Sequence, residues 1–156
     1  MAEIKKYLQE RGINFKVIKH PAIYTCEQAE RLVKNLAKIH SKNLFLRDKK
    51  TRKYYLVILP FDERLNIKEF EKRLNTKLSF AKPEQLKEVL GLTPGAVSPF
   101  GLINDKKNLV EVLIRKKIFD SAVVGFHPNI NTETLEITKE DFHKYLNLLK
   151  NKITII

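Results

Sequence analysis

Two short apolar runs separated by a charged stretch constrain the fold of this chain most strongly. Residues 43–46 and 54–59 are largely apolar, and residues 47–53 between them are mostly charged. Apolar runs of this length, joined by a polar turn, predict the two antiparallel strands of a β-hairpin. Because a hairpin cannot join parallel strands, the chain must contain a sheet that is at least partly antiparallel.

Helix signals alternate with further strand signals along the rest of the sequence. We expect helices at residues 2–11, 67–74 and 83–91, one that starts at Thr25 with Gln28 completing a capping box, and one that starts at Thr138. We expect further strands at residues 15–18, 78–80, 122–126 and 134–137, and a second hairpin from residues 101–103 and 109–114. The expected fold is α+β, with a central mixed, largely antiparallel sheet surrounded by helices. At 156 residues, the chain fits a single domain over residues 1–156.

The charge of the chain is strongly positive and uneven. The formal net charge is +12, and residues 1–80 carry nineteen basic against nine acidic side chains. The densest stretch is residues 42–53, where Phe45, Tyr54 and Tyr55 accompany the basic side chains. Basic groups pair with phosphates and aromatic rings stack on unpaired bases, so this stretch favours a nucleic-acid partner. The rings could equally belong to the core.

Several classes of protein and of site are disfavoured. A single cysteine, Cys26, excludes an intramolecular disulfide framework, and with no signal-like start it predicts a cytoplasmic protein. No apolar run approaches the ~18 residues that span a bilayer, so we expect no membrane partner. The four histidines lack metal-ligand spacing, and phosphate-binding and dinucleotide-binding motifs are absent. We therefore expect no metal site and no cofactor.

Three segments could carry chemistry. Residues 93–101 combine two prolines with two glycines, so they could aim backbone N–H groups at an oxyanion, or form only a structural turn. His127 follows an apolar strand, where it could bind a ligand, transfer a proton or tie down a turn. Lys42 opens a strand, where it could anchor a phosphate or be solvated.

The motifs of the whole chain, taken in order, resemble the YbaK-like prolyl-tRNA editing family. The matching segments are residues 20–25 (HPAIYT), 42–50 (KNLFLRDKK), 78–81 (LSFA), 90–105 (LGLTPGAVSPFGLIND), 125–129 (GFHPN) and 131–132 (NT). Within this family the chain is most similar to the free-standing alanyl-tRNA(Pro) deacylases. The resemblance implies the editing-domain fold and hydrolysis of alanine from mischarged proline tRNA, by the logic of a second sieve that admits the smaller amino acid. It also implies tRNA as a partner, and prolyl-tRNA synthetase as a second candidate partner.

The resemblance implies roles for individual residues. Lys42, next to Asn43, matches a lysine that holds the 3′-terminal phosphate or ribose, and His127 matches a histidine that orients the aminoacyl group. A loop matches the Gly-x-x-x-Pro segment whose amides hold the ester carbonyl or ribose, and it consists of Gly95, Ala96, Val97, Ser98 and Pro99. The amino-acid pocket is implied to be lined by Thr25, Cys26 and Ala29. Water is the expected nucleophile.

The chain departs from the family at one position, and other functions compete with alanine editing. Arg115 stands where the family often has aspartate, and we expect this change to leave the site residues untouched. The alternatives are removal of another small residue such as cysteine from tRNA(Pro), and a non-catalytic tRNA-binding accessory of a synthetase. A small-molecule hydrolase with a basic surface is a third alternative, and its activity would be insensitive to salt.

Overall fold

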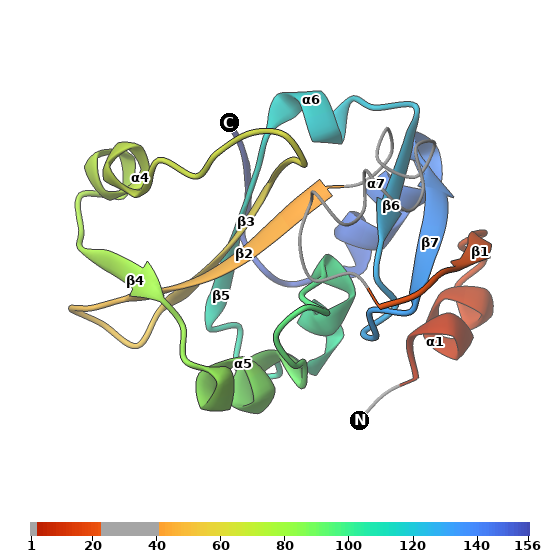
Figure 1. The fold of residues 1–156 in the computed structure, drawn as a ribbon, viewed down its shortest axis with the longest axis horizontal. Helices are drawn as coiled ribbons and strands as arrows, with labels where there is room; N and C mark the ends of the chain where they lie inside the picture. The colour runs from red at the N-terminus through yellow and green to blue at the C-terminus, as the bar shows by residue number, and fades with distance from the viewer. Residues whose placement is uncertain (1–2, 23–40) are drawn as a thin grey trace.

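The computed structural model of the protein describes residues 3–22 and 41–156 (Figure 1). The helices among these residues are α1 (Ile4–Glu10), α4 (Ile67–Leu74), α5 (Pro83–Leu90), the 3₁₀-helix η1 (Pro99–Asn104), α6 (Lys116–Phe119) and α7 (Lys139–Leu148). The strands are β1 (Lys16–Lys19), β2 (Ser41–Asp48), β3 (Tyr54–Pro60), β4 (Leu78–Phe80), β5 (Val110–Ile114), β6 (Val123–Phe126), β7 (Glu133–Thr138) and β8 (Ile153–Ile155). The expected α+β class is confirmed.

The predicted hairpin forms the centre of a five-stranded mixed sheet. Strands β2 and β3 pair antiparallel, with Lys42 opposite Leu59 and Arg47 opposite Tyr54. The strand order is β4-β2-β3-β5-β8, in which β4 is antiparallel to β2 while β5 and β8 run parallel to their neighbours.

A second sheet contains three antiparallel strands in the order β1-β7-β6. The sequence predicted these strands but placed all strands in one central sheet, whereas the structure divides them between two. In Figure 1 the smaller sheet lies at one side of the molecule, with α1 beside β1, and α7 contacts β6 and β7. Strand periodicity shows which side chains share a face but not which strands become neighbours, so the division could not be read from the sequence.

Apolar side chains cover both faces of β3. Leu56 and Ile58 belong to the larger core cluster, which also includes residues of α1, α5, η1 and the three-stranded sheet. Tyr55, Val57 and Leu59 belong to a smaller cluster under α4. The alternation follows the period of two in a strand, and it explains why the run at 54–59 is apolar throughout.

The expected second hairpin is wrong. Residues 99–104 form η1, begun by Ser98, whose hydroxyl accepts a hydrogen bond from the N–H of Phe100. Strand β5 then pairs parallel to β3, and the carboxylate of Asp105 accepts bonds from the N–H groups of Leu109 and Val110. Proline at the first position of η1 favours a helical turn over a strand, and the connection through α4, β4 and α5 is long enough for a parallel crossover.

The predicted helix boundaries that fall on described residues agree with the structure. Gly12 and Gly91 take positive φ at or just beyond helix ends, and the Thr138 hydroxyl accepts a bond from the N–H of Asp141. The helix expected from Thr25 lies outside the described residues. Helix α6 and strand β8 carried no sequence signal that we recognised. Among the described residues, no helix has both the length and the apolar character needed to cross a bilayer.

Candidate functional site

The side chain of Lys42 is held in place by the loop that follows β3. Lys42 lies near the start of β2 and is half-buried, and its Nζ donates a hydrogen bond of 2.7 Å to the backbone carbonyl of Glu63. This bond fixes the end of a long, rotatable side chain. Because a carbonyl oxygen satisfies only one of the three ammonium protons, the charge of Lys42 remains able to bind an anion.

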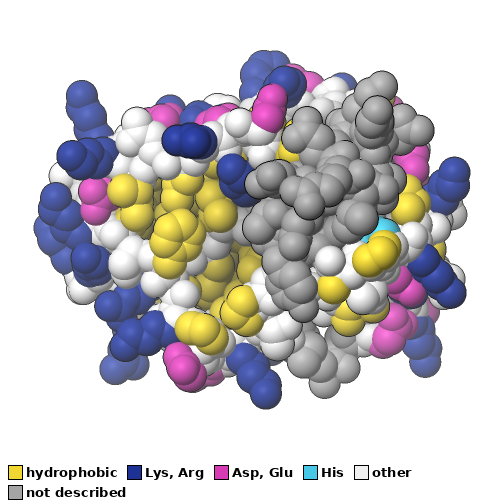
Figure 2. Space-filling model, viewed as in Figure 1, with side chains coloured by type: hydrophobic (Ala, Val, Ile, Leu, Met, Phe, Trp, Pro, Cys, Tyr) yellow, Lys and Arg dark blue, Asp and Glu magenta, His cyan; other side chains and the backbone are white. Residues whose placement is uncertain are grey.

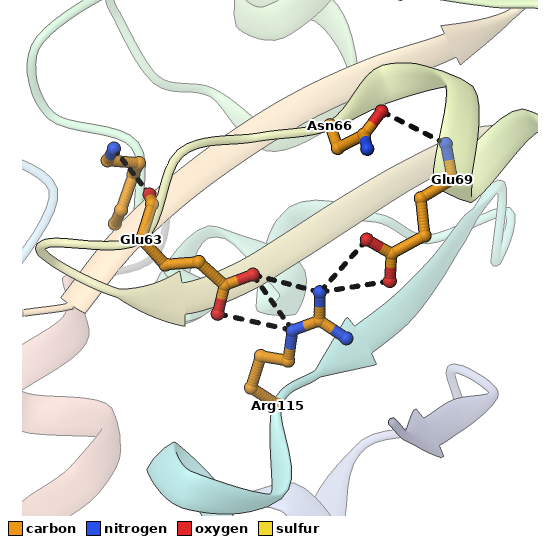
Figure 3. A network of polar contacts seen from close by, with 5 residues as sticks. Glu63, Asn66, Glu69 and Arg115 are labelled. Atoms are coloured by element: carbon orange, nitrogen blue, oxygen red, sulfur yellow. Dashed lines mark hydrogen bonds and ion pairs between the residues drawn. The ribbon is translucent and has the colours of Figure 1, made fainter.

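The carboxylate of Glu63 is itself clamped by Arg115, as Figure 3 shows. Arg115 Nη2 lies 2.8 Å from Glu63 Oε2 and 3.0 Å from Glu69 Oε1, and Arg115 Nε lies 3.0 Å from Glu63 Oε2. Asn66 caps α4 in the same loop, and its Oδ1 accepts a bond from the N–H of Glu69. Among the described residues Arg115 bonds to none of the predicted site residues, but Glu63 connects it to Lys42.

Asn43, the neighbour of Lys42, uses only part of its amide. Its Nδ2 donates a bond to Ser41 Oγ at 3.1 Å, while its buried Oδ1 has no hydrogen-bond partner among the described residues. The aromatic rings nearby belong mainly to the core. Phe45 and Tyr55 are buried, and Tyr54 stacks on Phe45 with ring centroids 5.1 Å apart. Phe45 and Tyr55 are thus not presented for base stacking.

The loop before η1 is braced at both ends and holds unused backbone donors. Near its start the N–H of Ala96 donates to the Thr93 carbonyl, and at its end the Pro99 carbonyl accepts a 2.6 Å bond from the Tyr145 hydroxyl. Ala96, Ser98 and Pro99 are buried, and Val97 is half-buried. Within the described part of the chain, the N–H groups of Gly95, Val97 and Ser98 donate no hydrogen bond. Three such groups in four residues can stabilise a developing negative charge.

Gly95 has a backbone conformation that other residues rarely adopt. Its φ is +88°, and an alanine there costs about 1–2 kcal/mol. We expect Gly95→Ala to lower the Tm by a few degrees and kcat/KM for ester hydrolysis at least about tenfold, because relief of the strain turns the adjoining N–H groups. Gly12→Ala is the matched control, since Gly12 also has positive φ (+69°) but lies after α1. Equal losses of activity in both variants would contradict a specific role of the loop.

His127 directly follows β6. Its Nδ1 donates a 2.9 Å bond to the carbonyl of Glu133, and the ring of the preceding Phe126 contacts the Phe100 ring of η1, with centroids 5.8 Å apart. A second buried histidine, His20, lies beside it with ring centroids 5.9 Å apart, and His20 Nε2 lies 2.9 Å from Thr134 Oγ1. Neighbouring residues of β7 therefore hold both imidazole rings.

Burial makes the charged form of His127 unfavourable. Burial, opposed in part by the bond to the Glu133 carbonyl and assisted by His20, lowers the pKa of His127 below its ordinary value of 6.5. The unfolded chain thus binds a proton at higher pH than the folded chain does. We expect the free energy of unfolding to be highest above pH 6.5 and to fall as the pH drops toward the folded-state pKa. His127→Asn, which can keep a donor to the Glu133 carbonyl, should flatten this part of a chemical-denaturation profile, and an unchanged profile would contradict the assignment.

The structure brings some of the predicted residues together and leaves others apart. The rings of Phe100, which follows the 95–99 loop, and Phe126, which precedes His127, are in contact, and β2, which carries Lys42 and Asn43, contacts β6. The hydrogen bonds of the described residues do not join Lys42 to the loop or to His127. Thr25, Cys26 and Ala29 lie outside the described residues. Over residues 3–22 and 41–156, no three metal-ligating side chains gather.

Sequence reasoning missed Glu63 as a partner of Lys42, and Thr134 as a partner of His20. Each contact joins residues far apart in the chain, 21 and 114 positions respectively. Neither Glu63 nor Thr134 stands in a motif that could have identified it, whereas His20 opens the HPAIYT segment.

Comparison with known proteins agrees with the resemblance noted in the sequence. The profile of the aminoacyl-tRNA editing domain matches residues 20–145. The prolyl-tRNA editing protein ProX of Acetoanaerobium sticklandii is 40% identical over 151 residues, which cover 96% of this chain and 92% of that protein. The mouse prolyl-tRNA synthetase associated domain-containing protein 1 is 32% identical over 151 residues, covering 90% of this chain and 86% of that protein.

A solved structure shares the fold. It belongs to a protein proposed to be a trans-editing enzyme for prolyl-tRNA synthetase, and it superimposes with a TM-score of 0.73 at 19% identity, covering 98% of this chain and 93% of that one. At this identity the likeness concerns the fold alone. The family profile spans most of the chain, and the relatives match it over nearly their full length. This chain belongs to the aminoacyl-tRNA editing domain family.

Proposed function

We propose that this protein hydrolyses the ester bond of alanine mistakenly attached to proline tRNA. The observation that carries the proposal is the 95–99 loop, in which the N–H groups of Gly95, Val97 and Ser98 donate no hydrogen bond within the described part of the chain. An editing protein named for prolyl-tRNA, 40% identical along almost the whole chain, supports the choice of substrate. The net charge of +12 suits a polyanionic substrate.

The proposed reaction needs no side-chain nucleophile. Lys42 binds the phosphate or ribose at the 3′ end, beside Asn43, and the N–H groups of Gly95, Val97 and Ser98 hold the ester carbonyl. The oxygen of water adds to the carbonyl carbon, and the negative charge that develops on the carbonyl oxygen is stabilised by those donors. The bond from carbon to ribose oxygen then breaks, and that oxygen takes the proton that the attacking water gives up. The products are alanine and tRNA with a free terminal hydroxyl.

His127 serves in this scheme as an uncharged group that orients the substrate. Its lowered pKa keeps the ring neutral at pH 7, and the bond from Nδ1 to the Glu133 carbonyl places the lone pair on Nε2. The neutral ring, fixed by this bond, orients the amino acid of the substrate. Thr25, Cys26 and Ala29 would line the amino-acid pocket and set its size limit, so that proline is excluded.

Partner and location follow from the same reaction. Acting on aminoacyl-tRNA, the protein would work in the cytoplasm, where translation consumes that tRNA. The name of the mouse relative favours a second candidate, a prolyl-tRNA synthetase accessory that binds tRNA without catalysis. The two candidates differ in whether the ester is cleaved.

A panel of esters on one tRNA tests the proposal. Alanyl-, cysteinyl- and prolyl-tRNA(Pro) are incubated with the purified protein, and the remaining ester is followed over time. We expect alanine to be released much faster than cysteine or proline. Faster release of cysteine would reassign the substrate, and binding of all three without cleavage would favour the accessory.

A further inference from the structure

A lysine-lined pocket lies at the end of the molecule that carries the β2–β3 turn and α4. Its volume is about 350 Å³, and four of the seven residues that line it are Lys50, Lys68, Lys72 and Lys77. All four are exposed, and among the described residues none of them forms an ion pair. Figure 2 shows Lys and Arg side chains, in dark blue, gathered at this end.

The acidic groups near the pocket are already engaged by the backbone. Glu71 lines the pocket, but its Oε2 accepts a 2.9 Å bond from the N–H of Leu78. The buried Asp48 accepts bonds of 2.8 Å from the N–H of Lys50 and from the hydroxyl of Thr76. These bonds join the hairpin turn to the segment after α4, so they build the walls of the pocket, in whose lining four lysines outnumber the single carboxylate of Glu71.

Lys68 on α4 lies where a positive charge costs helix stability, whereas Lys72 lies in the last turn, where the helix dipole favours one. Lys68 and Lys72 are four residues apart, so they share one helix face and repel each other. Lys68 also lies in the first turn, where the helix dipole disfavours a positive charge. A positive cluster that is present despite this cost can bind an external anion. Several lysines in one pocket can bind neighbouring phosphate groups.

The direction of β2 connects this pocket with the proposed active site. Lys42 lies near the start of β2, and Asp48, at its end, leads into the turn that contains Lys50. Six residues of extended strand span about 20 Å. A nucleic-acid strand carries one phosphate per about 3.4 Å of helix axis, so this distance corresponds to about six nucleotides. If the 3′ end of the RNA is bound at Lys42, the nucleotides that reach the pocket are those that follow the unpaired 3′ end, at the start of the stem.

We propose that the pocket formed by Lys50, Lys68, Lys72 and Lys77 binds backbone phosphates of the acceptor stem while the 3′ end occupies the site at Lys42. The inference rests on the proposed function. Phosphate contacts give affinity and position without reading sequence, so this surface would hold the stem and leave the choice of amino acid to the active site.

The test compares two quadruple variants of equal charge. One replaces the four pocket lysines by glutamine, and the other makes the exchanges Lys6→Gln, Lys16→Gln, Lys117→Gln and Lys150→Gln at exposed positions elsewhere. Each is assayed on full-length alanyl-tRNA(Pro) and on 3′-alanyl-adenosine, which has no stem. We expect the pocket variant to raise KM for the tRNA at least about tenfold, with unchanged kcat and unchanged hydrolysis of the short ester. The slope of log KM against the logarithm of the salt concentration should decrease by about 2–4, which is close to one for each lost phosphate contact.

The same variants separate this inference from the proposed function. Equal rises of KM in both variants would overturn the proposal. It would also be overturned if the pocket variant lost as much activity on the short ester as on the tRNA. If the unmodified protein cleaves neither ester, the proposed function fails, and binding of uncharged tRNA measured by fluorescence anisotropy then decides the pocket alone. A higher Kd for the pocket variant alone would support the proposed phosphate-binding pocket, and equal Kd values for both variants would overturn it.

Discussion

Lys42→Ala should lower kcat/KM for alanyl-tRNA hydrolysis by about 100-fold or more. The variant removes the positive charge that Lys42 presents to the 3′ end of the tRNA in the proposed site. The hydrogen bond to the Glu63 carbonyl already restricts the rotamers of Lys42 before substrate binds. A charged donor that is fixed in advance stabilises the bound substrate more than one that must first be ordered. Single-turnover hydrolysis by wild type and variant measures the effect.

Two further variants make this result specific. Lys116→Ala removes an exposed lysine paired with Asp120 and should leave the rate unchanged. Lys42→Arg keeps the charge but changes the shape of the donor, so it should recover only part of the activity. A Lys42→Ala variant that remains folded and hydrolyses alanyl-tRNA at the wild-type rate would contradict the assignment of this residue.

Arg115→Ala should reduce both stability and activity. Without the guanidinium, the carboxylates of Glu63 and Glu69 face each other unpaired, and the loop that holds the Lys42 ammonium loses its clamp. The groups are partly exposed, with side-chain exposures of 20%, 32% and 38% for Arg115, Glu63 and Glu69, so solvent screens part of the loss. We expect a destabilisation of about 1–2 kcal/mol and a fall in kcat/KM of about tenfold.

A double-mutant cycle separates the effect on Lys42 from general destabilisation. If Arg115 acts through the position of Lys42, its removal costs little further activity once Lys42 is alanine, so the two effects are not additive. Arg115→Lys should restore part of the stability but less of the activity, because an ammonium cannot bind both carboxylates in the same planar arrangement. Additive losses of activity in the cycle would contradict a positioning role.

Local patterns predicted the elements that local interactions determine. The hairpin strands, α4 and α5 could be located because their apolar spacing and their caps lie within the segments themselves. The parallel pairing of β5 with β3 and the division into two sheets depend on contacts between distant segments. Residues 101–103 are apolar because η1 is buried, and burial alone does not distinguish a short helix from a strand.

The sequence predicted the functional residues of the candidate site but not the residues that hold them in place. Lys42, the 95–99 loop and His127 stand in segments with an unusual composition, and their roles were assigned from the family resemblance. The carbonyl that holds Lys42 and the guanidinium behind it come from residues 63 and 115, which only the fold brings together. Arg115, which the sequence marked only as a departure from the family pattern, therefore acquired a meaning only from its two glutamate partners.

The most direct test of the account is the loss of the ester from alanyl-tRNA(Pro) when the purified protein is added. We predict that alanine is released far faster than in buffer alone, and that raising the salt concentration slows the reaction steeply because phosphate contacts are weakened. Release at the rate seen in buffer, by a protein that still binds the tRNA, would contradict the assignment as a deacylase.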